Sequence, residues 1–388
     1  MDAFFISKLF KLIDKVLIIN DKWLFFEIFF LCLLNQIYCN MKKLTLLFTL
    51  FLAIHTSHSQ ELESLLLASE DASKLTEGYI NPVMKGLMYS MNGGWATTGK
   101  VHKTLGFDLT ISANASYVPD ADKLFAFIPS DYNYLTLPNG ETSIPTVMSD
   151  NDYETTVDVE IDNGDGTYNV ASFEMPGGIT KDLPMNAVPA PMVQLGVGLP
   201  FKTDIKLRYV PKLNFDDSVE ANLIGLGLQH DLTQYLGPID KLPLSVSILG
   251  AFTNMDVTYN IEDDDPSDEV TVTNGEAAFE MKTWTVQAIG SLDFKIITLY
   301  GSVGYNGGKS SIKINGTYDL EYDIEDGGGT VIGTASDSVT DPIDLNFEST
   351  GVRGTLGARL NLAFFKIFAD YTLQEYNTLS AGIAFSFR

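Results

Sequence analysis

Residues 377–388 read NTLSAGIAFSFR and end the chain. Alternate side chains of an extended strand point to opposite faces, and one face of this strand is apolar throughout: Leu379, Ala381, Ile383, Phe385 and Phe387. In a soluble protein such an uncovered edge would favour aggregation. The strand is stable if its apolar face meets lipid and its edge pairs with the first strand of the same chain, because a closed barrel satisfies every backbone polar group in hydrocarbon. The stretch therefore predicts a transmembrane β-barrel.

The same alternation recurs upstream over about ten residues, the length that a tilted strand needs to cross a bilayer. It is clearest over 105–117, where the predicted outward residues are Phe107, Leu109, Ile111, Ala113, Ala115 and Tyr117. Further strands are predicted at 193–199, 205–209, 219–229, 244–259, 277–290, 296–306, 352–362 and 366–374. With the last strand and one expected near Val83, the number is eleven. Because bacterial barrels usually have an even number, we expect an all-β chain that forms a single closed antiparallel transmembrane β-barrel of about 12–14 strands.

A soluble β-sandwich is the main alternative, with its polar face toward water and its apolar face toward a core. A sandwich core needs large residues from both sheets. Here the face predicted to be outward also carries aromatic residues near the strand ends: Tyr117, Tyr209, Tyr259, Tyr305 and Tyr376. Aromatic residues at these places are typical of membrane interfaces, so the pattern favours the barrel.

The first sixty residues are predicted to be targeting sequence rather than fold. Residues 41–59 combine two lysines, an apolar run and small residues at the end, which is the pattern of a cleaved secretory signal peptide. Residues 1–40 are interpreted as an upstream extension from a start codon assigned too early; the alternative is a genuine N-terminal anchor helix. Both cysteines, Cys32 and Cys39, precede the predicted cleavage, so the exported chain would have no disulfide and no thiolate metal site.

After the signal peptide, residues 60–82 are predicted to be a short helical arm or a plug, because acidic residues are followed by leucines at helical spacing. The barrel is predicted over 83–388. Long polar insertions are predicted near 119–191, 260–276 and 307–350. We place them outside the cell, since outer-membrane barrels have long extracellular loops and short periplasmic turns. The first insertion contains a predicted polar hairpin, 155–161 against 167–173.

The chain carries 50 acidic and 25 basic residues, a formal net charge of −25. This charge argues against nucleic acid as a partner, since neutralising phosphates requires the opposite sign. We find no motif with the spacing of a catalytic triad, a zinc site or a calcium loop, and we therefore expect no enzymatic activity, no cofactor and no metal. A weaker hypothesis is a membrane-embedded hydrolase that uses His230. The acidic residues of 262–269 and 162–166 are interpreted as solvated loop, with a bound divalent cation as the alternative.

Four basic residues are predicted to point into the lumen of the barrel: Lys206, Arg208, Arg353 and Arg359. In a strongly acidic protein such residues could guide an anionic ligand, for instance a carboxylate. The alternative is structural, because Asp108, Asp204 and Asp370 are also predicted to point inward, where ion pairs could brace the wall.

Several stretches together resemble an uncharacterised family of Bacteroidota outer-membrane barrels: glycine-rich 87–95, the segment 102–108, the Gly-Leu-Pro-Phe-Lys hairpin at 198–202 and the ending Phe385-Ser386-Phe387-Arg388. The aromatic ending also resembles the C-terminal assembly signal of Gram-negative outer-membrane barrels, which implies contact with the barrel-assembly machinery. More distantly, the layout is similar to that of FadL-type long-chain fatty-acid transporters, whose barrel is plugged by its N-terminus.

These observations predict a monomeric, porin-like protein of the cell outer membrane, in contact with outer-membrane lipid and lipopolysaccharide. The main hypothesis is a passive channel or transporter for a small hydrophobic or anionic solute, gated by the N-terminal segment. The alternative is a structural or surface-binding barrel that acts through its acidic extracellular loops.

Overall fold

The computed structural model describes residues 69–150, 155–162, 168–215, 219–237, 243–261, 270–325 and 331–387, which belong to one compact unit, Ser57–Arg388. The predicted signal peptide, the upstream extension and the acidic residues of 262–269 lie outside the described residues. The helix and strands are α4 (Ser69–Met91), β1 (Phe107–Ser116), β2 (Leu124–Ala126), β3 (Leu135–Thr136), β4 (Ser143–Pro145), β5 (Thr155–Asp162), β6 (Tyr168–Met175), β7 (Val188–Leu199), β8 (Thr203–Phe215), β9 (Val219–Asp231), β10 (Leu244–Ile261), β11 (Val270–Asp293), β12 (Ile297–Glu325), β13 (Val331–Thr340), β14 (Ile343–Leu362), β15 (Phe365–Leu373) and β16 (Thr378–Phe387). Short 3-10 helices are Asp120–Asp122, Pro129–Asp131, Pro138–Gly140, Thr180–Asp182, Pro184–Asn186 and Thr233–Tyr235.

The main sheet closes on itself as an antiparallel ring. Its strands follow the order β1, β7, β8, β9, β10, β11, β12, β14, β15 and β16. The first strand pairs with β7 on one side and with the last strand, β16, on the other, so that Phe107 lies opposite Val197 and Phe387. The prediction of a closed antiparallel barrel whose terminal strand pairs with the first is confirmed.

The ring has ten strands rather than 12–14. All ten strands predicted from residue 105 onward form, and β13 extends the sheet outside the ring by pairing with the far end of β12. The strand expected near Val83 is wrong, because this residue lies in α4. Without that strand the ring has ten strands, which is already an even number, so no further strand is needed.

Side chains alternate across the wall with the polarity that lipid requires. On β1 the inward residues Thr110, Ser112 and Asn114 are buried, whereas the outward Phe107 and Leu109 are exposed. Large apolar residues on the outer face of other strands are likewise exposed: Val193, Leu228, Phe252, Val286, Val303 and Leu356. A soluble sandwich would bury its apolar face and expose its polar face, so the observed burial excludes that alternative.

Helix α4 continues nine residues beyond the predicted arm, through Met91. Its buried residues Leu75, Tyr79, Ile80 and Val83 recur at helical spacing. Two glycines allow close packing: a Cβ at Gly78 would lie 2.7 Å from the Phe125 ring, and one at Gly86 would lie 2.6 Å from Val188. Among the described residues, no helix has both the length and the hydropathy of a membrane-spanning helix.

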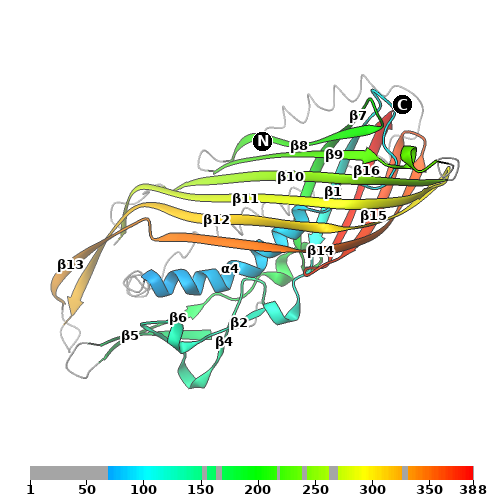
Figure 1. Ribbon diagram of the computed structural model, residues 1–388. Coiled ribbons are helices and arrows are strands. Elements are labelled where there is room, and N and C mark those ends of the chain that lie inside the picture. Colours follow the sequence, from blue (N-terminus) through cyan, green and yellow to red (C-terminus); the bar gives the residue numbers. More distant parts are fainter. Residues whose placement is uncertain are drawn as a thin grey trace, which may run out of the picture. The chain divides into compact units, whose positions relative to one another are not determined.

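Several strands run far past the ends of their neighbours, as Figure 1 shows for β11 and β12. The predicted loop at 307–350 is therefore wrong in part, because β12 and β14 continue into it as a hydrogen-bonded ladder that ends at Ile314 opposite Ile343, and β12 then pairs with β13. Beyond the ring the inner face of this extension becomes apolar, with Phe279, Met281, Leu345 and Phe347 buried. Helix α4 packs on β11, β12 and β14 there, so the extension and the helix share a core.

The first insertion connects β1 to β7 and ends at residue 187 rather than 191. Its predicted hairpin is present, with β5 paired to β6 from Thr155 opposite Met175 to Asp162 opposite Tyr168. Tyr376, predicted at the membrane interface, is instead fully buried and donates a 2.6 Å hydrogen bond to Asp122 of this insertion. The predicted loop at 260–276 is shorter than expected, because β11 begins at Val270.

One seam of the ring is short. Strands β7 and β8 pair from Gln194 opposite Arg208 to Leu199 opposite Thr203. Beyond Gln194, β7 continues along β1 while β8 continues along β9. By comparison, β10 and β11 pair along the whole length of β10.

Candidate functional site: a lumen occupied by residues 92–104

Between α4 and β1 the chain passes along the inside of the ring as an irregular segment, residues 92–104, which we call the lumen segment. At its start the Asn92 side chain donates to a β12 carbonyl (3.1 Å). Midway the Thr98 carbonyl accepts from Gln229 of β9 (2.9 Å). At its end the Leu105 amide donates to a β7 carbonyl (2.8 Å). Residues after the helix therefore lie inside the ring, whereas residues 69–82 of the predicted arm or plug belong to α4.

Arg208 of β8 is the most connected of the predicted lumen residues, and it is fully buried. Its two terminal nitrogens donate to the carbonyl oxygens of Met91 and Gly93, each at 2.7 Å, and its Nε donates to Gln194 (3.1 Å). The guanidinium carbon also lies 3.7 Å from the centre of the Trp95 ring, a cation–π contact. The residue thus fixes the point at which α4 ends.

Arg353 approaches the same point from β14. It is buried, and its Nη1 donates to the Asn92 carbonyl (2.7 Å) while Nη2 lies 3.3 Å from the Thr372 hydroxyl. Carbonyls at a helix C-terminus lack partners within the helix and carry partial negative charge. Arg208 and Arg353 together therefore cap α4 with two cations.

The other predicted lumen residues also point inward but have different surroundings. Arg359 donates to the Thr97 hydroxyl (3.1 Å), so it too touches the lumen segment. Lys206 is buried on the inner face of β8. Of the predicted inward carboxylates, Asp204 accepts the backbone N–H of His102 and lies 2.9 Å from its ring Nδ1. The three arginines and Asp204 thus hold the lumen segment itself, a role that neither the ligand hypothesis nor the wall-bracing hypothesis included.

The apolar part of the lumen centres on Trp95. This side chain is 1% exposed and packs with Leu249, Ala251 and Ile289 of the wall. A Cβ at Gly227 would lie 3.0 Å from the indole ring, so the wall is hollowed to receive it. Trp95 was not predicted as a site residue, although a tryptophan between glycines in a polar stretch was a signal that could have marked it.

Glycine is required at two points of the lumen segment. Gly94 has a φ of +67°, which L side chains rarely adopt. At Gly99 a Cβ would lie 2.6 Å from the backbone oxygen of Ser245, so a side chain there would collide with the wall. The segment passes close to the strands because these positions lack a side chain.

Comparison with known proteins identifies a family that includes this region. A model of a family of unknown function matches residues 41–387. The chain belongs to the DUF6588 family. A search of curated proteins finds no match.

Solved structures similar to this DUF6588 protein include Ail, the attachment invasion locus protein of Yersinia pestis, at 10% identity, covering 74% of this chain and 100% of that chain with a TM-score of 0.22. Another is the translocator domain of autotransporter NalP from Neisseria meningitidis, at 12% identity, covering 82% and 99% with a TM-score of 0.24. A third is a BenF-like porin from Pseudomonas fluorescens Pf-5, at 10% identity, covering 74% and 99% with a TM-score of 0.11. At these scores the similarity carries no argument, and the barrel rests on its own ring of hydrogen bonds.

A second cluster in the DUF6588 protein fastens α4 to the turn between β15 and β16. Tyr89 donates to Glu375 (2.7 Å), and Lys85 forms a 3.1 Å ion pair with the same carboxylate. Burial acts to raise the pKa of Glu375, but the hydrogen bonds from Tyr89 and Lys85 outweigh it, so that this pKa lies below its usual value. Burial also raises the pKa of the Tyr89 phenol, which stays protonated and able to donate.

This cluster predicts a pH dependence. A carboxylate whose pKa is lowered by folding contributes stability above its unfolded pKa, near 4.5, and that stability is lost as pH falls through the folded pKa. We expect the free energy of unfolding to decrease between about pH 5 and pH 3, by less than about 1 kcal/mol because Glu375 is 43% exposed. Urea unfolding of the wild type and of Glu375→Gln across this range measures it. Equal pH slopes for the two proteins would contradict the assignment.

The hydrolase hypothesis requires a carboxylate that orients His230. Its Nδ1 lies 2.8 Å from the Thr203 hydroxyl and its Nε2 lies 3.2 Å from the Tyr235 hydroxyl. The neighbouring Asp231 points the other way and accepts the Thr233 amide. His230 thus bridges the ends of β8 and β9 and has no orienting carboxylate in these contacts. Within the ranges that the structure describes, no group of three or more acidic, histidine or cysteine residues could hold a metal ion.

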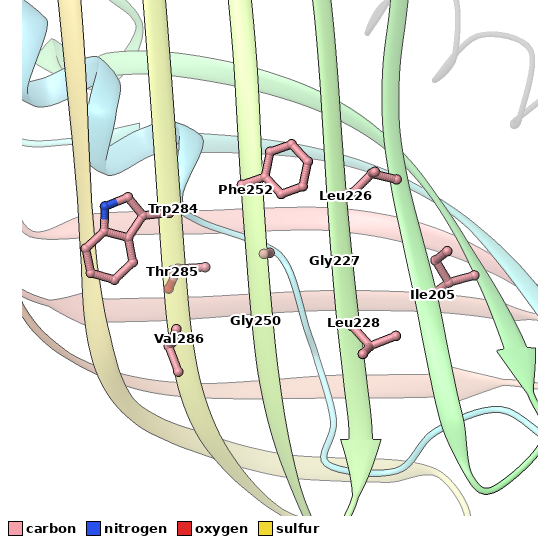
Figure 2. Close-up of a pocket in the computed structure, with 10 residues that line it drawn as sticks. Ile205, Leu226, Gly227, Leu228, Gly250, Phe252, Trp284, Thr285 and Val286 are labelled. Carbon is pink, nitrogen blue, oxygen red and sulfur yellow. The ribbon is translucent and has the colours of Figure 1, made fainter.

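The outer wall carries a shallow apolar depression of about 380 Å³. Figure 2 shows Leu226, Leu228, Phe252 and Trp284 around it, with Gly250 at its floor. These apolar side chains are exposed on the outer face of the ring. The depression therefore belongs to the surface that faces lipid and is separate from the lumen.

Proposed function

We propose that this protein is a passive channel of the Gram-negative outer membrane for a small anionic solute, and that the lumen segment is its gate. The supporting observation is that Arg208 and Arg353 donate to backbone carbonyls of the lumen segment and of Met91, the last residue of α4. When the segment moves, these donors become available to a carboxylate or phosphate of the solute, which are the groups that guanidinium binds best.

The lining favours an anionic over a hydrophobic solute. Buried inward side chains along the ring are mainly polar: Thr110, Ser112, Gln194, Gln229, Ser247, Thr253, Thr283, Thr285, Gln287, Thr355 and Thr372. An apolar chain would displace water and hydrogen-bonding partners from these groups at a cost of about 1–3 kcal/mol for each group left unpaired. In this proposal, the likeness to FadL-type transporters extends to the plugged layout only.

The same proposal includes the oligomeric state, the membrane contacts and the assembly of the barrel. The protein would act as a monomer in a Bacteroidota outer membrane, in contact with lipid and lipopolysaccharide. Strand β16 would be the element that the barrel-assembly machinery recognises. The proposal assigns no enzymatic reaction to the barrel.

A disulfide that ties the lumen segment to the wall tests the gate. The hydroxyls of Thr98 and Ser291 lie 3.1 Å apart, so Thr98→Cys and Ser291→Cys place two thiols next to each other for oxidation to a disulfide. We expect the oxidised variant in planar bilayers to show no conductance, and reduction to restore the opening events of the wild type. Cys32 and Cys39 are changed to serine throughout.

The matched control ties two wall strands instead. Ser116 of β1 and Thr378 of β16 have hydroxyls 2.6 Å apart, and a disulfide between these positions leaves the lumen segment free. This control should conduct in both redox states. A wild type that never conducts, from protein shown to be folded, would overturn the channel proposal.

A second candidate function is binding at the cell surface. The extension of β11, β12 and β14 favours it, because its outer face carries exposed ion pairs, Lys309 with Glu348 and Lys313 with Asp344, and is not made for lipid. Replacing Lys309, Glu348, Lys313 and Asp344 by alanine should then abolish ligand binding and leave conductance unchanged.

A further inference from the structure

We infer that the polypeptide crosses the membrane eleven times, once as the lumen segment and ten times as strands, so that α4 lies on the opposite side from the end of β16 and forms part of the cell surface. The inference rests on the proposed outer-membrane location. It adds a topology that the channel proposal does not require.

The outer face of the wall marks one boundary of the membrane. Three residues opposite one another on β11, β12 and β14 are charged and exposed: Lys282, Lys309 and Glu348. Two residues further along each strand in the direction of the ring, the outward positions are Trp284, Gly307 and Thr350, and apolar side chains such as Val286 and Val352 follow. Aromatic residues at the edge of an apolar band are typical of the lipid–water interface.

The other boundary lies at the short turns. On β11 the apolar outer face continues from Trp284 to Leu292, and the exposed Phe294 follows in the turn to β12. This distance is about ten residues, the length of one tilted crossing. Phe364 and Phe387 stack on each other at the neighbouring strand ends, with ring centroids 6.1 Å apart. The turns between β11 and β12 and between β14 and β15 therefore share one side with the C-terminal end of β16.

Helix α4 lies beyond the first boundary. Its last turns reach the level of the charged row, where Tyr89 hydrogen-bonds Ser349 (2.9 Å) and a Cβ at Gly308 would lie 3.0 Å from Met88. The helix then covers the apolar inner face of the extension, which begins with Met281 next to Lys282. That face would otherwise be exposed to water outside the membrane, so the extension needs the helix on its side.

The lumen segment connects the two boundaries. It leaves α4 at the level of Gly307, whose carbonyl accepts from Asn92. It reaches the opposite end where His102 binds Asp204, beside the turn between β7 and β8, and β1 starts there at Phe107. Ten strands alone return a chain to the side on which it began. Because the lumen segment adds an eleventh crossing, α4 and the end of β16 lie on opposite sides of the membrane.

The inference is tested by single cysteines in the full chain, with Cys32 and Cys39 changed to serine, and a membrane-impermeant maleimide applied to intact cells. Glu77 on α4 and Lys100 in the lumen segment are both exposed. We expect Glu77→Cys to be labelled at least tenfold more than Lys100→Cys on intact cells, and both to be labelled equally after permeabilisation. Positions only 23 residues apart would then flank the membrane.

Two reference variants separate the possible failures. Asp344→Cys marks the extension and Lys295→Cys marks a short turn. If these two differ on intact cells while Glu77→Cys follows Lys295→Cys, the barrel stands and the threaded topology is overturned. If Asp344→Cys and Lys295→Cys are labelled alike, the outer-membrane proposal itself fails. If both pairs differ with the order reversed, α4 and the end of β16 still lie on opposite sides, but the placement of α4 at the cell surface is overturned.

Discussion

Replacing Arg208 by methionine should open the channel. The change keeps most of the side-chain volume but removes the donors to the Met91 and Gly93 carbonyls, which are buried against the wall. A buried group left without a partner costs about 1–3 kcal/mol, so the two carbonyls together should destabilise the closed lumen segment by about 2–6 kcal/mol. We expect frequent opening in planar bilayers where the wild type is mostly closed, and a lower free energy of unfolding in urea.

Two control variants make this result specific. Arg208→Lys keeps the charge but replaces the planar fork by a single ammonium group, so it should have an intermediate effect. Arg359→Met removes a bond to the Thr97 hydroxyl at a half-buried position and should have a small effect. An Arg208→Met protein that stays closed and as stable as the wild type would show that the lumen segment is held mainly by other contacts.

Replacing Trp95 by alanine should have the second large effect. The indole is 1% exposed among Leu249, Ala251 and Ile289 and also lies under the Arg208 guanidinium. Truncating a buried tryptophan to alanine typically costs about 3–5 kcal/mol. The cavity that remains lies inside the lumen, so we expect a lower urea midpoint together with a small, steady ion leak.

The matched control for this variant is Trp284→Ala. Trp284 is 40% exposed on the outer face of β11, so its truncation removes a lipid contact and leaves the lumen filled. Trp95→Phe should fall between the two in stability and in leak. A leak of the same size in Trp284→Ala and Trp95→Ala would locate the path outside the lumen and contradict the role given to Trp95.

Much of the fold could be predicted because lipid imposes a simple pattern. The apolar band selects one face of each strand with period two, and this pattern identified all ten strands of the ring. The wrong predictions concern parts of the chain where lipid does not select an apolar outer face. Over 307–350 the outer face of the strands is charged, as at Lys309 and Glu348, so the ladder of β12 and β14 resembles a loop in sequence. Near Val83, Gly86 and the following turn residues imitate the end of a strand, whereas the buried spacing is helical.

The site could be predicted only in part. The pleat correctly placed Arg208 and Arg353 inside, because inward and outward positions follow from alternation alone. What they bind could not be read from the sequence, since their partners are carbonyl oxygens, which every residue carries. A sequence pattern is a pattern of side chains. The arginines bind the backbone of the lumen segment, and no side-chain pattern marks that backbone.

The short seam between β7 and β8 gives the lumen segment a second consequence. The last pair of that seam is Gln194 with Arg208. The side chains of these two residues are hydrogen-bonded to each other. Arg208 is in turn held by the Met91 and Gly93 carbonyls. On the channel proposal, departure of the segment would remove the Met91 and Gly93 carbonyls from Arg208. We then expect the end of the β7–β8 seam to become more mobile when the channel opens.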